Sequence, residues 1–328
     1  MKIDNIAKLK EELSDAIKKY TSIAIVTHKN PDGDGLPAAL ALQEIIAVKE
    51  KKADVILERS SPEIYEFLNG EKRTQVFSNH HYYEFLIILD CHEKTRIGAC
   101  APLIPTASKI ISIDHHKEGE LIENSLTYID TNMVSVGAIL FNLFESELNK
   151  FPKKSANYIA KAIYTTILND TDNFINTNTD AETFRICSQL MEYNIKPGYI
   201  TEHFLLNKPP KQMKFIGEVL SKIQTYEDDQ ILFMGTTLEM LEQYNLDSEA
   251  TSKLTRWVKG TRGIKATVCF QEINSRRYRL SLRSNDIDVN KIAVKFGGGG
   301  HIKASGCEIK GSLPDIKKQI IKEIRKQL

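Results

Sequence analysis

Acidic and imidazole side chains gather in four short clusters within the first 172 residues of this 328-residue sequence. The clusters are His28 to Asp34 (HKNPDGD), the single Asp90, Asp114 to His116, and Asp170 to Asp172. Carboxylates supplemented by imidazoles are the ligands that hard and borderline divalent cations prefer. The candidate ligands are His28, Asp32, Asp34, Asp90, His115 and Asp170. A set of this size suits two ions, so we predict a dinuclear metal site.

Each cluster also has a simpler interpretation. Taken alone, HKNPDGD is typical of an Asp-rich turn that caps the following helix, and any one of these residues could be a satisfied polar group at a sheet edge. In the metal-site interpretation, Asp32 and Asp34 lie two apart in an extended segment and each serves a different ion. The four clusters together favour the metal site, because chance rarely places all of them at the ends of secondary-structure elements.

The elements expected to position these clusters are buried parallel strands. Apolar runs at residues 22–27, 53–57, 85–89 and 109–113 predict strands, and helical patterns lie between and after them, at 34–49, 134–148 and 155–168. Such interleaving is typical of a mostly parallel sheet with helices on its faces. Three of the strands end directly before a cluster, and a parallel sheet brings these carboxyl ends to one edge.

The length of the chain exceeds that of one typical domain, so two domains are expected. We predict a metal-binding catalytic domain at residues 1–190 and a helical connector at 191–215, where turn signals occur at 196–198 and 208–210. A smaller α/β domain is predicted at 216–328. It should contain strands at 231–237, 264–272 and 277–283 and a closing amphipathic helix at 314–327.

The composition is ordinary for a globular protein, with 41% hydrophobic and 27% charged residues. No apolar run reaches the length of about 18–20 residues that a membrane span needs, and charges occupy the first ten positions where a signal peptide would be apolar. We therefore expect a cytoplasmic protein with no membrane partner. The five cysteines are scattered without a CxxC spacing, which predicts neither a disulfide framework nor a thiolate metal site.

The two ends of the chain carry opposite charge. Residues 251–328 contain 18 Lys and Arg against 6 Asp and Glu, whereas residues 1–250 contain 26 against 37. Two ordinary solvated surfaces would explain this. The alternative is an acidic metal-holding domain facing a basic phosphate-holding one, which predicts an active site in the cleft between the domains.

The C-terminal domain contains its own candidate phosphate site. Four consecutive glycines, of which Gly298, Gly299 and Gly300 precede His301, could form a nest of backbone N–H groups with the imidazole at its rim, although a glycine run alone is usually a flexible turn. Upstream, the alternation YRLSLR at 278–283 places its polar residues on one face of a strand. Arg283 would then present a rigid guanidinium to a phosphate.

The four N-terminal clusters, in this order, resemble the motifs of the DHH phosphoesterase family. The segment FGGGGHIKASG at residues 296–306 is similar to the signature of the C-terminal domain associated with that family. The resemblance covers nearly the whole chain. Its length and C-terminal signature are nearest the branch that degrades oligoribonucleotides (nanoRNA) and removes the 3′-phosphate of adenosine 3′,5′-bisphosphate.

The resemblance implies a role for each candidate residue. One ion would be held by His28, Asp32 and Asp90, and the other by Asp34, Asp90, His115 and Asp170, with Asp90 bridging. His116 would contact the scissile phosphate, Asp114 would orient an imidazole, and Arg283 would bind substrate. Mn²⁺ is the first choice of metal, with Mg²⁺ and Co²⁺ as alternatives. Asp172 and His92 are left unassigned.

The implied function is metal-dependent hydrolysis of phosphate esters on short nucleotides. Expected substrates are linear dinucleotides such as pApA and pGpG, slightly longer nanoRNA, and adenosine 3′,5′-bisphosphate. The alternatives are a cyclic-dinucleotide phosphodiesterase, a single-strand exonuclease, an exopolyphosphatase, or an inactive nucleotide-binding regulator. A single tryptophan and 8% aromatic residues provide no clear stacking platform for long single strands. Long duplex nucleic acid is not an expected partner, and homodimer formation is left open.

Overall fold

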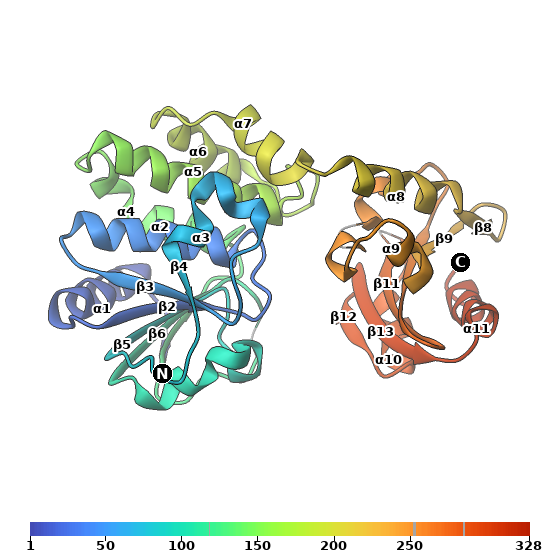
Figure 1. Ribbon diagram of the computed structural model, residues 1–328, viewed down its shortest axis with the longest axis horizontal. Helices are drawn as coiled ribbons and strands as arrows, with labels where there is room; N and C mark the ends of the chain where they lie inside the picture. The colour runs from blue at the N-terminus through green and yellow to red at the C-terminus, as the bar shows by residue number, and fades with distance from the viewer. Residues whose placement is uncertain (118, 252–253, 285) are drawn as a thin grey trace. The chain divides into compact units, whose positions relative to one another are not determined.

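The computed structural model describes residues 1–117, 119–251, 254–284 and 286–328. The chain divides into two compact units, residues 1–207 and residues 208–328 (Figure 1). The first contains a seven-stranded parallel sheet and the second a six-stranded mixed sheet, each with helices on it. This architecture confirms the predicted α/β fold class. None of the helices in the described ranges is long and apolar enough to cross a membrane.

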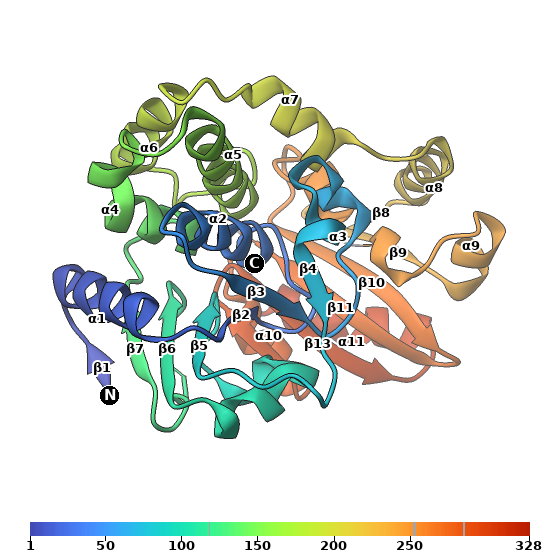
Figure 2. The same ribbon diagram turned by 60° about the vertical axis from the view of Figure 1, so that its left-hand side comes forward.

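The sheet of the first unit has the strand order β1-β7-β6-β5-β2-β3-β4, which Figure 2 shows from one edge to the other. Its strands are β1 (Lys2–Ile3), β2 (Ile23–Thr27), β3 (Ala53–Leu57), β4 (Thr74–Val76), β5 (Phe85–Leu89), β6 (Lys109–Asp114) and β7 (Leu126–Ile129). The four strands predicted from the sequence are confirmed and form the centre of the sheet. In this sheet, the sequence analysis missed β1, β4 and β7.

Alternate residues of the central strands enter two different cores, because successive side chains of a strand point to opposite faces. Ile23, Ile25 and Ile87 pack into the larger core with helices. Ala24 and Val26 pack on the other face, together with the 3₁₀ segment Gly98–Thr106. Burial on both faces explains why these strands appear in the sequence as continuous apolar runs.

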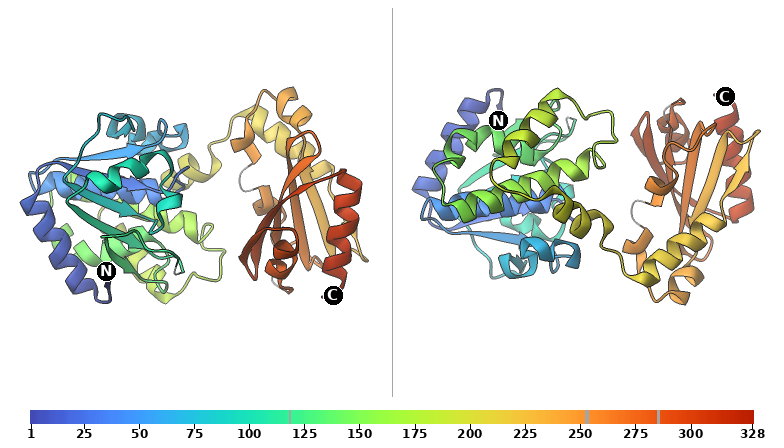
Figure 3. Two further views of the ribbon diagram at one scale, coloured as in Figure 1. Left: turned by 90° about the horizontal axis from the view of Figure 1, so that it is seen from below. Right: turned by 90° about the horizontal axis from the view of Figure 1, so that it is seen from above.

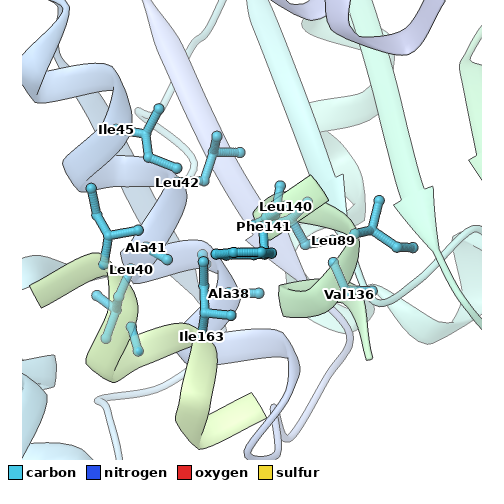
Figure 4. Packing of buried hydrophobic residues seen from close by; sticks show 14 of the residues in the cluster. Ala38, Leu40, Ala41, Leu42, Ile45, Leu89, Val136, Leu140, Phe141 and Ile163 are labelled. Carbon is cyan, nitrogen blue, oxygen red and sulfur yellow. The ribbon is translucent and has the colours of Figure 1, made fainter. Parts of the chain in front are cut away.

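The helices of the first unit are α1 (Ile6–Lys19), α2 (Gly35–Val48), α3 (Gly70–Arg73), α4 (Val136–Leu148), α5 (Lys153–Asp170), α6 (Ala181–Met191) and α7 (Pro197–Thr201), followed by a π-helical turn (Glu202–Leu206). α2 contributes Leu40, Leu42 and Ile45 to a cluster with Phe141 of α4 and Ile163 of α5 (Figure 4). This packing fixes the start of α2 and the end of α5, where two of the acidic clusters lie.

The second unit contains α8 (Pro210–Ser221), β8 (Gln224–Tyr226), β9 (Ile231–Thr236), α9 (Leu238–Gln243), β10 (Ala266–Asn274), β11 (Arg277–Arg283), α10 (Val289–Lys295), β12 (Gly299–His301), β13 (Ala304–Lys310) and α11 (Leu313–Arg325). The strand order is β12-β13-β11-β10-β9-β8. α10 and α11 cover one face of this sheet through a core that includes Leu280, Leu282, Ile292 and Ile320 (Figure 3).

Candidate metal centre

Three adjacent strands of the first sheet end at candidate metal ligands. β2, β5 and β6 are neighbours and run parallel, and they are followed by His28, by Asp90, and by His115 with His116, respectively. Their carboxyl ends therefore meet at one edge of the sheet. Asp90 has a φ of 59°, a left-handed conformation that non-glycine residues rarely adopt. The chain turns sharply at this residue, directly after β5.

The first group of potential ligands consists of His28, Asp32 and Asp90. The Nε2 atom of His28 lies 3.3 Å from Oδ2 of Asp90 and 3.8 Å from Oδ1 of Asp32. One ligand atom from each of the three residues lies within 4.8 Å of the others, which is close enough for all three to contact one cation.

The second group consists of Asp34, His115 and Asp170. The Nε2 atom of His115 lies 3.1 Å from Oδ2 of Asp170 and 3.5 Å from Oδ2 of Asp34. Asp170 is the last residue of α5, and Asp34 directly precedes α2. Two packed helices and a strand end thus bring together ligands that are far apart in the sequence.

Asp90 connects the two groups. Its Oδ1 atom lies 3.8 Å from Nε2 of His115 and 3.2 Å from Nδ1 of His116, and these three residues form a further potential ligand group. Oδ2 of the same carboxylate faces His28. A carboxylate with one oxygen toward each group has the arrangement of a bridging ligand.

The donor atoms fit divalent cations. Oδ1 of Asp90 and Nε2 of His115 are buried and make no hydrogen bond to the described residues, and leaving buried polar atoms without partners is costly. Burial, followed by the charges of Asp170 and Asp90, raises the pKa of Asp34 well above its usual value. Burial also raises the pKa of Asp170. A cation among these side chains would bind the two buried atoms that lack a hydrogen bond, and it would neutralise the charge of the neighbouring carboxylates.

The imidazoles respond to the same charges. Although burial opposes protonation, the nearby carboxylates of Asp32 and Asp90 raise the pKa of His28 to about 10. Burial likewise opposes protonation of His115, but Asp170 and Asp90 raise its pKa to about 9. In the metal-free protein, protons on these rings therefore supply part of the positive charge that the carboxylates require.

Asp114 orients two imidazoles. Its Oδ1 atom accepts a hydrogen bond from Nδ1 of His116 at 2.8 Å, and its Oδ2 atom lies 2.5 Å from Nδ1 of His92. The backbone N–H groups of His115 and His116 also donate to Oδ1. Hydrogen bonding to both imidazoles and to the His116 backbone outweighs burial and lowers the pKa of Asp114. The predicted orienting role agrees with these contacts.

His92 and Asp172, which the sequence left unassigned, lie outside the three ligand groups found among the described residues. His92 is only 1% exposed, so it is not a surface residue. It contacts Asp114 rather than a ligand carboxylate. Asp172 lies in a turn after α5, with a φ of 50°.

The segment from His28 to Asp34 is a turn, not the extended segment that we expected. Oδ1 of Asp32 accepts hydrogen bonds from the N–H groups of Asp34 and Gly35, so part of the helix-capping interpretation was right. Asp34 instead accepts from the N–H groups of Val136 and Gly137, at the start of α4, at 2.7 and 3.2 Å. The turn, rather than β-strand alternation, sends the two carboxylates to different ligand groups.

Gly33 permits this turn to pack closely. A Cβ atom at this position would lie 2.3 Å from the ring of Phe204 and 2.7 Å from Cβ of Asn169. Phe204 belongs to the π-helical turn and is 3% exposed. Neither Phe204 nor the N–H donors of α4 could be found from the sequence, because no local pattern links them to the HKNPDGD segment.

In the second unit, Arg283 and His301 lie on one row of the sheet. Arg283 on β11 pairs with Ala304 on β13, and Ala304 pairs with His301 on β12. Directly opposed residues point to the same face, and Ala304 between them is small. Arg279 is held by Glu308 at 3.0 Å. Arg283, by contrast, has no acidic partner among the described residues, and its Nη1 atom donates to the Leu282 carbonyl.

The prediction of a nest of glycine N–H groups is wrong for the first two glycines. The N–H groups of Gly297 and Gly298 donate to the Val294 and Ala293 carbonyls at the end of α10, so neither is available to a phosphate. A Cβ atom on Gly298 would lie 2.1 Å from the Gly306 carbonyl oxygen. Close approach to β13 is therefore one reason for this glycine, and Gly299 and Gly300 lie in β12.

A parallel sheet edge with this set of carboxylates and imidazoles is the arrangement that a metal-dependent phosphoesterase needs. Residues 22–167 match the DHH family, N-terminal domain, and residues 216–328 match the DHHA1 domain. The chain belongs to the DHH family of phosphoesterases.

Similar proteins are known from several bacteria. The chain is 26% identical over 317 residues to "Bifunctional oligoribonuclease and PAP phosphatase NrnA" of Mycoplasma genitalium, covering 95% of this chain and 97% of that protein. It is also 26% identical to the protein of the same name from Thermus thermophilus, covering 93% and 90%. A crystal structure of an exopolyphosphatase-related protein from Bacteroides fragilis has the same fold, with a TM-score of 0.87 at 21% identity over 98% of this chain and 96% of that one.

Proposed function

We propose that this protein uses two divalent metal ions to hydrolyse phosphate esters on short nucleotides. The observation that carries the proposal is the sharing of Asp90 between the potential ligand groups on either side of it. In the proposed site, one ion is held by His28, Asp32 and Asp90, and the other by Asp34, Asp90, His115 and Asp170. Mn²⁺ is the preferred ion, because mixed carboxylate and imidazole ligands suit it.

When bound, two such metal ions acidify a water molecule and neutralise the charge that builds on the phosphoryl oxygens. The residues of the chain do the positioning. Asp34 is held in place by the N–H groups of Val136 and Gly137. His116 is proposed to contact the scissile phosphate. Because Nδ1 of this imidazole is bound to Asp114, its Nε2–H group is left to donate to a phosphate oxygen.

His116 is suited to an anionic ligand. The carboxylates of Asp114 and Asp90 raise its pKa to about 10, so the ring is positively charged at neutral pH in the metal-free protein. Its side chain is 41% exposed, whereas that of Asp90 is 2% exposed. A half-exposed cation beside buried carboxylates can reach a substrate phosphate without leaving Asp114.

The proposed substrates are pApA, pGpG, short nanoRNA and adenosine 3′,5′-bisphosphate. The names of the full-length relatives support this range. We further propose that Arg283 and His301, with Gly298, Gly299 and Gly300 shaping the strand beside them, bind a terminal phosphate of the substrate. Among the described residues Arg283 has no acidic partner, which supports this role. The cleft between domains, the cytoplasmic location and a homodimer stay predictions.

The test is a substrate panel with Mn²⁺ on the full chain and on Arg283→Ala. We expect hydrolysis of pApA and release of phosphate from adenosine 3′,5′-bisphosphate. Arg283→Ala should raise the activation free energy of pApA hydrolysis by about 1.5–3 kcal/mol, the scale of a charge-assisted hydrogen bond. The activation free energy of ApA hydrolysis should stay nearly unchanged. Arg279→Ala, whose guanidinium is already paired with Glu308, is the matched control.

Two outcomes count against the proposal. No turnover of any short nucleotide with Mn²⁺ would leave the regulator alternative as the better account. Equal losses of kcat/KM on pApA and ApA in Arg283→Ala would rule out recognition of the terminal phosphate by this residue.

A further inference from the structure

A cavity of about 960 Å³ opens in the first unit at the end of α5 that is opposite to the metal centre. Its lining comes from the end of α4, the first turns of α5, the segment after α6, and α7. The cavity begins beside Lys153, the first residue of α5, whereas Asp170 is the last. At 1.5 Å per residue, these helix ends are roughly 25 Å apart. None of the proposed metal ligands lines the cavity.

The lining is strongly cationic. It contains Lys153, Lys154, Lys161 and Lys196 against the single acidic residue Glu192. Nζ of Lys161 donates to the Phe67 carbonyl at 2.9 Å, so this lysine is already held.

The other three lysines are exposed and have neither an ion pair nor a side-chain hydrogen bond to any residue in the described ranges. Elsewhere in this unit, Lys49 and Lys109 pair with Glu147 and Glu12. Three unpaired cations around one cavity, in the acidic part of the chain, favour an anionic ligand.

The lining also has an aromatic wall, and hydrogen bonds hold part of it in place. Phe151, Tyr193 and Tyr199 line the cavity. The side-chain amide of Asn157 donates to the carbonyls of Tyr193 and Asn194 at 2.9 and 3.0 Å, and the Tyr193 hydroxyl donates to Asn149 at 2.9 Å. These contacts fix the loop after α6 against α5 before any ligand arrives, which lowers the entropy cost of binding.

We propose that this cavity is a second ligand site that binds a small phosphorylated aromatic molecule of the nucleoside monophosphate class. The phosphate would be held by Lys153, Lys154 and Lys196, and the base would lie against Tyr193 or Tyr199. The volume falls within the range of about 300–1,000 Å³ that is usual for small-ligand sites. The inference does not rest on the proposed activity, since no residue is shared with the metal centre.

Lysine footprinting of the metal-free full chain tests the site directly. The probe is 5′-AMP, and the readout is the acetylation rate of each lysine by mass spectrometry. At ten times the Kd, AMP should slow acetylation of Lys154 and Lys196 roughly tenfold, because the rate follows the unbound fraction. Lys72, an exposed lysine of the same unit outside the cavity, should be unaffected. Equal protection of all three lysines, or none, would overturn the proposal.

Charge reversal and a second probe define the ligand class. Lys154→Glu and Lys196→Glu should each remove the protection of the remaining cavity lysines by AMP, whereas Lys72→Glu should retain it. Inorganic phosphate should protect at much higher concentration than AMP if the aromatic wall contributes. If phosphate and AMP protect equally well, the nucleotide assignment is wrong. If the Lys72→Glu variant loses protection as well, the effect is general electrostatics and not a site.

Discussion

At the scale of single residues, Asp114 is the side chain on which the imidazoles depend most, although it belongs to none of the ligand groups. It holds His116 and His92 and also accepts from two backbone N–H groups. Asp114→Asn should lower kcat for pApA roughly 10- to 100-fold, the usual cost of removing a residue that orients a ligand or catalytic imidazole. Metal content should stay near that of the wild type.

Asp130→Asn is the matched control. Asp130 follows β7 at the same sheet edge and accepts hydrogen bonds from Tyr128 and Asn132, but it contacts none of the candidate ligands. This variant should retain full kcat. An Asp114→Asn protein with wild-type kcat would show that the orientation of His116 does not matter to the reaction.

The raised pKa values of the imidazoles predict how metal binding depends on pH. His28 and His115, with pKa values of about 10 and 9, are protonated at pH 7 in the metal-free protein. An imidazole must lose its proton to bind a metal, so binding releases protons and strengthens as pH rises from 6.5 toward 9. Titration with Mn²⁺ in buffers of different ionisation enthalpy measures this release. A proton count of zero at pH 7 would contradict the charge assignment.

The sequence alone was sufficient to propose all six ligands, because each lies directly after or beside a recognisable strand or helix. It could not assign His92, whose burial depends on packing against Asp114 from the next strand. It also could not show that Asp34 is held by the N–H groups of α4, since that contact joins residues about 100 positions apart. Long-range partners of this kind leave no local pattern.

At the scale of elements, the close packing of the turn before α2 predicts a strong effect at Gly33. Gly33→Ala would force a Cβ atom against Phe204 and Asn169. We expect it to lower the free energy of unfolding by about 1–3 kcal/mol, as overpacking usually does, and to reduce metal binding because Asp32 and Asp34 flank it. Chemical denaturation with a parallel metal assay measures both effects.

Gly217 provides the contrasting substitution. It is an exposed residue in α8, and a Cβ atom there would meet nothing within 4 Å. Gly217→Ala should therefore stabilise the protein by about 0.5–1 kcal/mol, because alanine loses less backbone entropy in a helix. If Gly33→Ala raises the free energy of unfolding as Gly217→Ala does, the packing argument at Gly33 is wrong.

Elements with strong apolar patterns were predicted well, and short or irregular ones were not. The strands β2, β3, β5 and β6 have five or six residues each, of which all but Asp54 and Lys109 are buried. β1 has two residues and β4 has three, too few for any periodicity to appear. In the second unit, the alternation in β11 was correct, with Tyr278, Leu280 and Leu282 buried. The glycine segment was misjudged because its N–H partners at the end of α10 depend on how the chain turns.

At the scale of the whole molecule, each unit has its own hydrophobic cores. The core of the first unit includes Ile195, Ile200, Phe204 and Leu205, which belong to the segment predicted as a connector. The second unit contains two separate cores, one on each face of its sheet. The turn signals at 196–198 and 208–210 could not reveal that packing, because turns occur within a domain as well as between domains.

The central claim is that two metal ions share Asp90 and that hydrolysis depends on both. The most direct measurement is bound Mn²⁺ per chain together with the rate of pApA hydrolysis, on the same samples of wild type, Asp90→Ala and Asp172→Asn. We predict two ions and full turnover for wild type and for Asp172→Asn, whose carboxylate lies outside the ligand groups. Asp90→Ala should hold one ion or none and show no turnover. Full metal content with retained turnover in Asp90→Ala would contradict the account.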